Sequence, residues 1–227
     1  MNDHRKPDAP AWFVTGTDTE VGKTFATCAL LLALKKQGHR AVGMKPVAAG
    51  TDAHGRNDDV EQLKAASDVS APPELINPYL FQPAIAPHIA AAEAGVAIDI
   101  ERIAAAFLRL RETADAVLVE GVGGFLVPLG GDCDSADLAA RLGLPVILVV
   151  GLRLGCINHA LLTCQAIAAC GLPLAGWIAN RIDPDMQRWE ENLAALRERI
   201  AAPLLGVIPP HSTPEEAANL LRLPAPL

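Results

Sequence analysis

Hydrophobic residues gather into short runs along the chain, and most of the runs are separated by stretches with helical character. The runs are Trp12–Thr15, Ala41–Val47, Ala116–Val119, Val146–Val150, Leu174–Ala179 and Leu204–Ile208. They lack the alternation of apolar and polar residues that marks a strand with one face in water. The pattern therefore predicts an α/β fold, with a doubly wound, mainly parallel sheet and helices on both faces. In such a fold the ligand site lies beyond the carboxyl ends of the strands.

Three intervening segments carry clear helical signals. Thr24–Gln37 is rich in Ala and Leu and is followed by Gly38, a residue that often ends a helix. A second helix is expected at Asp99–Thr113. A third helix has one apolar packing face, made of Trp189, Leu193, Leu196 and Ile200.

Two other segments are predicted to be irregular. Residues 48–57 are rich in Gly, Asp and Asn, and residues 71–88 contain five prolines. Both are candidate active-site loops. No repeat, low-complexity segment or linker indicates a second domain, so we expect one domain over residues 11–227. Residues 1–10 are expected to be a disordered leader, because no apolar stretch of a signal peptide follows their basic residues.

Composition excludes several classes of protein. The chain has 227 residues, of which 51% are hydrophobic, enough to bury a large core. Its formal net charge is −7 and it has no basic stripe, which argues against a nucleic-acid partner. The longest apolar run, Leu144–Leu152, is far shorter than the roughly 20 residues of a membrane helix, so we expect a cytoplasmic protein. Five cysteines without Cys-x-x-Cys spacing argue against a disulfide framework or a zinc site.

The segment from Gly16 to Thr24 directly follows the first expected strand and opens the first helix. Its Gly22-Lys23-Thr24 triplet is typical of a phosphate-binding P-loop, in which backbone N–H groups surround phosphate oxygens, the lysine reaches the terminal phosphates and the hydroxyl binds Mg²⁺. Five residues separate Gly16 from Gly22, one more than in the common P-loop. A glycine-rich turn without a ligand is the alternative, but the triplet at a helix start favours phosphate binding.

Two further charged residues stand at the carboxyl ends of expected strands. Lys45 lies at the carboxyl end of the strand expected in the second run and is expected to face the phosphates rather than solvent. Glu120 ends the third run at the position where P-loop enzymes place a second metal-directed carboxylate. The glycines between residues 121 and 124 would allow a ligand to approach closely.

For several other polar residues the sequence allows more than one role. Asp58 and Asp59 either cap a helix that begins near Val60, or one of them is a metal ligand. Glu20 would repel phosphate if it pointed into the loop, so it is expected to face substrate ammonium groups or solvent. No catalytic role is assigned to the loop histidines His88, His159 and His211.

These motifs, in this order, resemble the dethiobiotin synthetases. The similarity runs from Trp12 to about His211. It includes Asn77-Pro78-Tyr79, Pro87-His88, Gly151, Leu154 to His159, and Ala175 to Asn180. The resemblance implies a P-loop NTPase fold and a cyclo-ligase that carboxylates 7,8-diaminononanoate with CO₂ and closes its ureido ring. ATP would be the co-substrate and would phosphorylate a carbamate, giving a carbamic-phosphoric anhydride and then ADP and phosphate.

The resemblance also implies a role for each matching residue. Lys23 and Lys45 would be catalytic, and Thr24, Asp59 and Glu120 would hold Mg²⁺. The nucleotide site would comprise Thr19, Glu20, Val21, Gly22, Lys23, Thr24, Asp59, Glu120, Gly121, Val122, Gly123, Asn180, Arg181, Pro209, Pro210 and His211, with Asn180 and the 209–211 segment at the adenine. The substrate site would comprise Thr19, Lys45, Ala49, Gly155, Cys156, Ile157 and Asn158, the last four from the partner subunit of a homodimer.

Two positions depart from the family pattern. Ala49 stands where members often carry a serine, and Arg181 stands where an aspartate is common.

Two other functions remain as alternatives. A corrinoid a,c-diamide-synthetase-like ligase would normally carry an added glutaminase domain, and no Cys-His pair on extra chain length is present. A partitioning or cell-division ATPase switch would carry an extra lysine early in the loop, where this chain has Thr17, Asp18 and Thr19. Dependence of ATP turnover on a small diamine would separate the enzyme from the switch.

Overall fold

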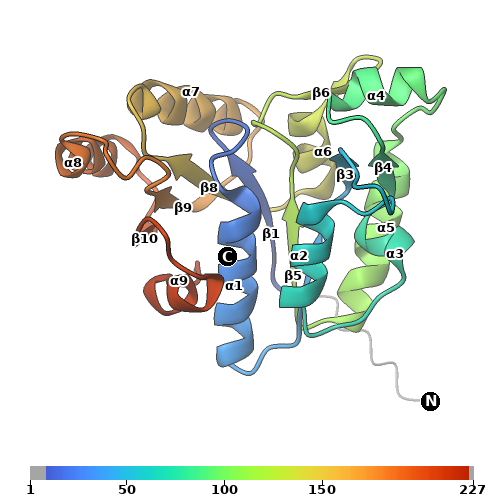
Figure 1. Cartoon of the computed structure of the whole chain (residues 1–227), viewed down its shortest axis with the longest axis horizontal. Helices are drawn as coiled ribbons and strands as arrows, with labels where there is room; N and C mark the ends of the chain where they lie inside the picture. The colour runs from blue at the N-terminus through green and yellow to red at the C-terminus, as the bar shows by residue number, and fades with distance from the viewer. Residues whose placement is uncertain (1–8, 225–227) are drawn as a thin grey trace.

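A central sheet of six parallel strands lies between two layers of helices in the computed structural model, which describes residues 9–224 (Figure 1). The strand order is β10-β9-β8-β1-β5-β2, and every neighbouring pair in this sheet is parallel. The strands are β1 (Ala11–Gly16), β2 (Ala41–Met44), β5 (Ala116–Glu120), β8 (Val146–Gly151), β9 (Leu174–Asn180) and β10 (Leu204–Ile208). The predicted doubly wound α/β fold is confirmed.

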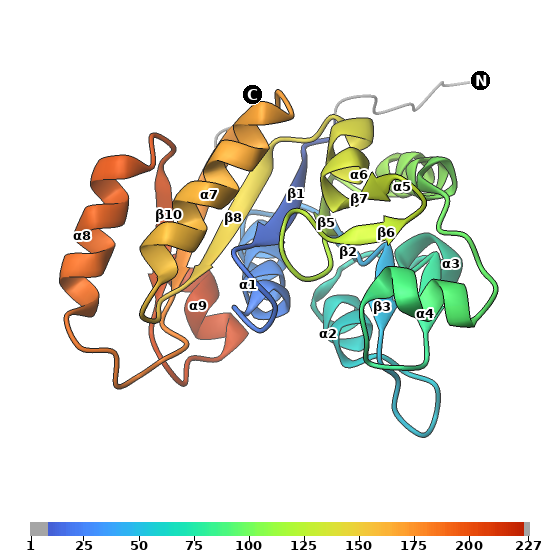
Figure 2. The same cartoon turned by 90° about the horizontal axis from the view of Figure 1, so that it is seen from above.

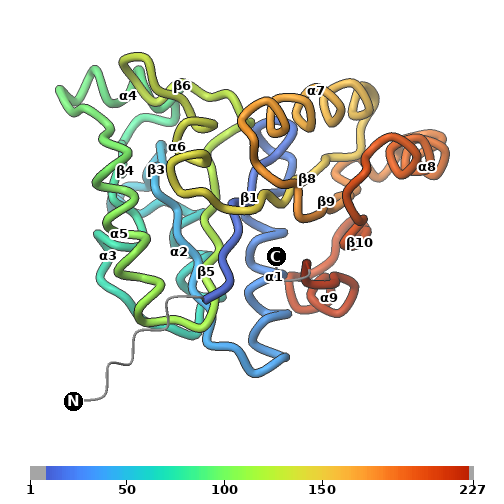
Figure 3. Tube along the Cα trace, turned by 180° about the vertical axis from the view of Figure 1, so that it is seen from behind, coloured from blue at the N-terminus to red at the C-terminus, as the bar shows by residue number. Residues whose placement is uncertain are grey.

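The helices cover both faces of this sheet. They are α1 (Lys23–Lys36), α2 (Asp58–Ala66), α3 (Pro73–Ile76), α4 (Pro87–Glu93), α5 (Ile100–Thr113), α6 (Ser135–Leu142), α7 (Cys156–Ala169), α8 (Trp189–Arg199) and α9 (Pro214–Leu220). Viewed from above, α5, α6 and α7 lie on one side of the sheet, and α1, α2 and α9 lie on the other (Figure 2). Seen from behind, α3, α4 and α5 lie toward one edge of the molecule, and α8 lies at the opposite edge (Figure 3).

Successive residues of a strand enter different halves of the core. In β1, Phe13 packs with Val119 and Leu110 on the α5 side, whereas Val14 packs with Leu30 on the α1 side. Side chains alternate across a strand, so a sheet covered on both faces needs apolar residues at every position. The expected face of α8 is confirmed too, because Leu193, Leu196 and Ile200 are buried and Trp189 packs against them.

The prediction of one strand over Ala41–Val47 was wrong. The chain leaves the main sheet after Met44, and β3 (Val47–Ala49) pairs instead with β4 (Tyr79–Phe81) in a separate two-stranded sheet. Pro46 has no N–H to donate to a strand neighbour. Lys45 is held outside the main sheet, with its N–H donating to Ile76 O at 2.8 Å and its carbonyl accepting from Asn77 Nδ2 at 2.6 Å.

The expectation of irregular structure over residues 48–57 and 71–88 was also partly wrong. Those ranges contain part of β3, all of α3 and β4, and the start of α4. Proline begins both helices, at Pro73 and Pro87, where its missing N–H costs no helical bond. A further two-stranded ribbon, formed by β6 (Pro128–Gly130) and β7 (Cys133–Asp134), precedes α6.

Most of the expected leader, residues 1–8, lies outside the described residues. Ala9 is buried, and its carbonyl accepts a hydrogen bond from Arg111 at 3.0 Å. Pro10 O accepts from Val117 N at 3.0 Å, so both of these residues pack on the domain. Across residues 9–224, none of the helices is long and apolar enough to span a membrane.

Candidate active site

The P-loop connects the end of β1 to the start of α1 and is braced by β9. Gly22 has φ +82°, and a Cβ there would lie 2.2 Å from Asn180 Nδ2, so glycine is required for two reasons. The same Asn180 nitrogen donates to Val21 O at 3.0 Å. Lys23 Nζ donates to the carbonyl of Asp18 at 2.9 Å, within the loop itself.

Four side chains from different elements form a charged cluster beside this loop. Thr24 Oγ1 donates to Glu120 Oε1 at 2.7 Å. Lys45 Nζ donates to the same Glu120 oxygen at 2.6 Å and to Asp59 Oδ2 at 2.9 Å. The structure therefore brings together the residues assigned to Mg²⁺ and one of the two lysines assigned to catalysis. Asp59 lies in the first turn of α2, which Asn57 rather than either aspartate caps.

Within this cluster, Lys45 and Asp59 each favour the ionised form of the other. Burial opposes the charge of Lys45, but Glu120 and Asp59 outweigh it and raise the pKa of that ammonium. Burial likewise opposes ionisation of Asp59, yet the attraction of Lys45 leaves the pKa of that carboxyl below its usual value. Lys23 behaves differently, because burial and the nearby Lys45 charge lower its pKa to about 8.

Thr24, Asp59 and Glu120 have the donor chemistry that Mg²⁺ prefers. Mg²⁺ binds hard oxygen ligands and is commonly held by one or two carboxylates together with substrate phosphates and water. Within residues 9–224, no group of three or more His, Cys, Asp and Glu side chains could hold a metal without such help. Glu120 is fully buried, and its Oε2 has no hydrogen-bond partner among residues 9–224. This oxygen is therefore available to bind a metal ion. The residues therefore fit the ion.

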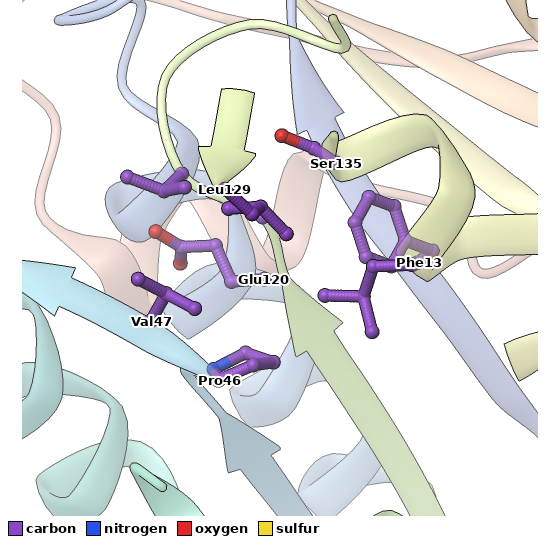
Figure 4. A pocket seen from close by; sticks show the side chains of 9 residues that line it. Phe13, Pro46, Val47, Glu120, Leu129 and Ser135 are labelled. Carbon is purple, nitrogen blue, oxygen red and sulfur yellow. The ribbon is translucent and has the colours of Figure 1, made fainter. Parts of the chain in front are cut away.

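A small cavity lies behind Glu120. Figure 4 shows the Glu120 side chain between Val47 and Leu129, with Phe13 and Ser135 on the far side. The cavity has a volume of about 10 Å³, room for at most one water molecule, so a substrate must bind elsewhere.

The substrate-sized pocket lies over the P-loop and measures about 770 Å³. Predicted residues that line it are Thr19, Glu20, Gly22, Lys23, Thr24, Lys45, Ala49, Asp59, Val122 and Gly123. Sequence reasoning missed an apolar part of the wall, formed by Ala48, Ala84, Ile85, Ala86, Pro87 and Val127. Ala48 and the residues from Ala84 to Pro87 lie in the two segments predicted to be active-site loops, but none of the six residues was predicted as a site residue.

A second pocket of about 330 Å³ adjoins the other side of the P-loop. It is lined by five predicted residues, Asn180, Arg181, Pro209, Pro210 and His211, and by Phe25, Ile182, Pro184, Ile208 and Ser212. The guanidinium of Arg181 lies 4.1 Å from the centre of the Trp189 ring, a cation–π contact that fixes this wall.

Several predicted residues do not line either large pocket. Val21, Glu120 and Gly121 lie behind the P-loop pocket, where Val21 is buried and Gly121 O lies 3.4 Å from Lys45 Nζ. Gly155, Cys156, Ile157 and Asn158 are absent from both pocket walls and form the start of α7 instead.

Solved structures support the fold. The chain is similar to a ParA family ATPase from Chlorobium tepidum, with a TM-score of 0.56, 14% identity and coverage of 93% of this chain and 91% of that one. It is also similar to the cell division ATPase MinD of Pyrococcus furiosus, with a TM-score of 0.54, 16% identity and coverage of 92% and 95%. At these identities the likeness shows the fold alone.

Sequence relatives are much closer. A family model described as an AAA domain matches residues 11–217. The ATP-dependent dethiobiotin synthetase BioD of Aromatoleum aromaticum is 62% identical over 94% of this chain and 97% of its own length. The enzymes of the same name from Nitrosospira multiformis and Xanthomonas axonopodis are 59% and 54% identical, over 87% and 95% of this chain and 87% and 98% of their own lengths. The chain therefore belongs to the ATP-dependent dethiobiotin synthetases, a family of P-loop ligases in biotin biosynthesis.

Proposed function

We propose that this enzyme carboxylates 7,8-diaminononanoate with CO₂ and closes its ureido ring, using ATP and Mg²⁺ and releasing ADP and phosphate. The observation that carries the proposal is the 62% identity to a dethiobiotin synthetase over 94% of the chain. The site supports it, because a pocket of about 770 Å³ joins a P-loop to a lysine held between two carboxylates.

Each step of the reaction would use groups of the P-loop pocket. One amine adds to CO₂ and loses a proton, which gives a carbamate. A carbamate oxygen then attacks the γ-phosphate of ATP, ADP leaves and a carbamic-phosphoric anhydride forms. The second amine attacks the carbonyl carbon and loses a proton, phosphate departs with the bonding electrons, and the ring closes. The protein's task is to position two anions and to offset their charge.

The two lysines divide this task. Lys23 is the first residue of α1, at the end of the P-loop. When ATP binds, the Lys23 ammonium would exchange its hydrogen bond to Asp18 O for one to the terminal phosphate and stay with that phosphate as it is transferred. Lys45 would face the carbamate from a fixed position, because Glu120 and Asp59 orient its ammonium. Thr24, Asp59 and Glu120 would hold Mg²⁺, which supplies positive charge to the phosphates when it is bound.

The apolar part of the pocket suits the hydrocarbon chain of the diamine. Ala84, Ile85, Ala86 and Pro87 follow one another along one wall, and Val127 adds another apolar side chain. Ile85 is 40% exposed, so an alkyl chain laid against it would remove apolar surface from water. Ala49 offers no hydroxyl at the position where relatives often have serine, so the amines would depend on other polar groups.

We further infer that the enzyme is a homodimer whose active sites use both subunits. Helix α7 is largely apolar, yet Cys156, Ala160 and Ile167 are the residues of this helix that the described chain buries. Leu154, just before it, is 91% exposed, and Leu162 is 56% exposed. One face of α7 packs on the core, and exposed apolar side chains such as Leu154 and Leu162 beside or on such a helix are typical of a contact between two copies. The N–H groups at its start could then receive the substrate carboxylate at the partner's P-loop.

An ADP-release assay tests the proposed reaction. We expect release to require the diamine, bicarbonate and Mg²⁺ together, because a carbamate forms only when amine and CO₂ meet. Omitting each component in turn should return the rate to background. Vigorous turnover with ATP and Mg²⁺ alone would contradict the carboxylase and favour an ATPase switch.

A further inference from the structure

Asp18 places a negative charge inside a loop that must bind a polyanion. All three of its oxygens are engaged. The backbone carbonyl accepts from Lys23 Nζ at 2.9 Å, Oδ1 accepts from the N–H of Thr19 at 2.7 Å, and Oδ2 forms an ion pair with the guanidinium of Arg153. The residue therefore shapes the P-loop and also sets the resting position of its lysine.

Arg153 reaches this loop from another part of the sheet. It lies in the short connection between the end of β8 and the start of α7, 135 residues from Asp18. Among the described residues, Arg153 is the ion-pair partner of Asp18. The side chains are 46% and 40% exposed, so water screens the pair but does not remove it.

The balance of charge decides what this ion pair does. With Arg153 present, the Asp18–Arg153 pair has no net charge beside the proposed phosphate site. Without Arg153, an uncompensated carboxylate would stand in the loop and repel a triphosphate. The loop would also lose its link to the β8–α7 connection, although the contacts that Asp18 makes to Thr19 and Lys23 would remain.

We propose that Arg153 is a positioning residue for the nucleotide, which acts through Asp18 by cancelling its charge and fixing it within the P-loop. The proposal rests on the assignment of this loop as the ATP site under the proposed function. Asp18 and Arg153 were not among the site residues expected from the sequence, and neither lines the P-loop pocket.

A double-mutant cycle tests the proposal, with the Kd for ATP and Mg²⁺ measured by calorimetry in the absence of diamine. Arg153→Ala should weaken ATP binding about fivefold, the effect of losing a screened charge pair of about 1 kcal/mol. Asp18→Asn should bind ATP as well as the wild type or better, because an amide oxygen can still accept from Thr19 N while the negative charge is gone. The double variant should return to the wild-type Kd.

A purely structural role gives a different order of affinities. If the ion pair only keeps the loop folded, Asp18→Asn and Arg153→Ala should weaken binding equally and the double variant should not recover. That result, or a wild-type Kd in Arg153→Ala, overturns the proposal. Arg153→Lys keeps the charge and should stay within about twofold of the wild type. In the diamine-dependent reaction, Arg153→Ala should raise the KM for ATP and leave kcat unchanged.

The ion pair between Arg141 and Glu101 provides a matched control. It joins α6 to α5, and neither residue lines the P-loop pocket. Arg141→Ala should leave the Kd for ATP unchanged, and thermal unfolding should show that all variants are folded. Failure of the proposed function can be told apart, because loss of diamine dependence in the wild type would leave the calorimetric cycle intact.

Discussion

Lys23 contacts its own loop in this structure and is proposed to contact ATP phosphates when nucleotide binds. Its ammonium donates to Asp18 O, and burial together with the charge of Lys45 lowers its pKa to about 8. A triphosphate would favour the charged lysine and raise this pKa, so the residue titrates differently in the free and the bound enzyme. Nucleotide affinity should consequently depend on pH in the alkaline range.

We expect ATP binding to weaken as the pH rises above 8. In that range Lys23 is increasingly neutral in the free enzyme, so binding must take up a proton, and the Kd should rise toward a limit of about tenfold per pH unit. Below about pH 7 the lysine is almost fully charged and this contribution should be flat. Calorimetry at pH 8.5 in two buffers of different ionisation enthalpy measures the proton uptake directly. A Kd that is constant from pH 7 to 9 with no proton uptake would contradict the assignment.

Two neighbouring aspartates offer a direct test of the proposed metal site. Asp59 lines the pocket and pairs with Lys45 at 2.9 Å, whereas Asp58 is exposed and absent from the pocket. Asp59→Asn should raise the Mg²⁺ concentration for half-maximal activity about tenfold or more, because it removes a negative charge that either binds Mg²⁺ directly or orients a group that does. Asp58→Asn should not change it. Mg²⁺ titrations of the two variants at saturating ATP make the comparison, and equal responses would refute the assignment of Asp59.

At the scale of elements, the P-loop depends on the end of β9 as much as on its own sequence. Asn180 donates to Val21 O and occupies the space where a side chain at Gly22 would point. Asn180 lines the second pocket and Gly22 lines the P-loop pocket, so their contact lies between the two pockets. A change at this contact should disturb both the loop conformation and nucleotide binding.

Gly22→Ala should be markedly worse than a similar substitution elsewhere. Gly171 supplies the control, because its φ is +70° and a Cβ added there would have no atom within 4 Å among the described residues. Alanine at either site is expected to cost about 1–2 kcal/mol because φ is positive, but only at Gly22 would it also collide with Asn180. Thermal unfolding should show a larger loss for Gly22→Ala, and its ATP binding should be lost while Gly171→Ala binds normally. If the two variants lost the same stability and bound ATP equally well, the contact between the added Cβ and Asn180 would have no energetic effect, and the prediction would be wrong.

Local signals made the P-loop and the main strands predictable. The Gly22-Lys23-Thr24 triplet lies within one strand–loop–helix unit, and each main strand is a continuous apolar run. Lys45 and Glu120 were each predicted at the carboxyl end of a strand, and such ends meet at one edge of a parallel sheet, but the ion pair between them, 75 residues apart, was not predicted.

Features that depend on distant pairing were not predictable. β3 pairs with β4 across 32 positions between Val47 and Tyr79, and neither short strand has a periodicity of its own. The ion pair of Asp18 with Arg153 joins two loops, whose side chains carry no pattern in the sequence. Such contacts follow from tertiary geometry rather than from local propensity.

At the scale of the whole molecule, one chain leaves the proposed substrate site incomplete. The P-loop pocket is lined by both lysines and by the metal-directed residues Thr24 and Asp59, but Gly155 and Asn158 at the start of α7 do not line it. The proposed homodimer would resolve this, because the N–H groups at the start of α7 would receive the substrate carboxylate at the partner's pocket. Each active site would then need a P-loop from one chain and a helix start from the other.

Subunit exchange between two impaired variants tests this arrangement. Lys23→Ala should abolish activity by removing charge from the phosphate site, and Asn158→Ala should weaken diamine binding more than ATP binding. In a heterodimer of the two, one site would carry both lesions and the other site neither. Activity should therefore reappear on mixing, up to about half the wild-type rate per mixed dimer. With exchange confirmed by native mass spectrometry, the absence of any gain over the separate variants, or a fully active monomer, would refute the shared site.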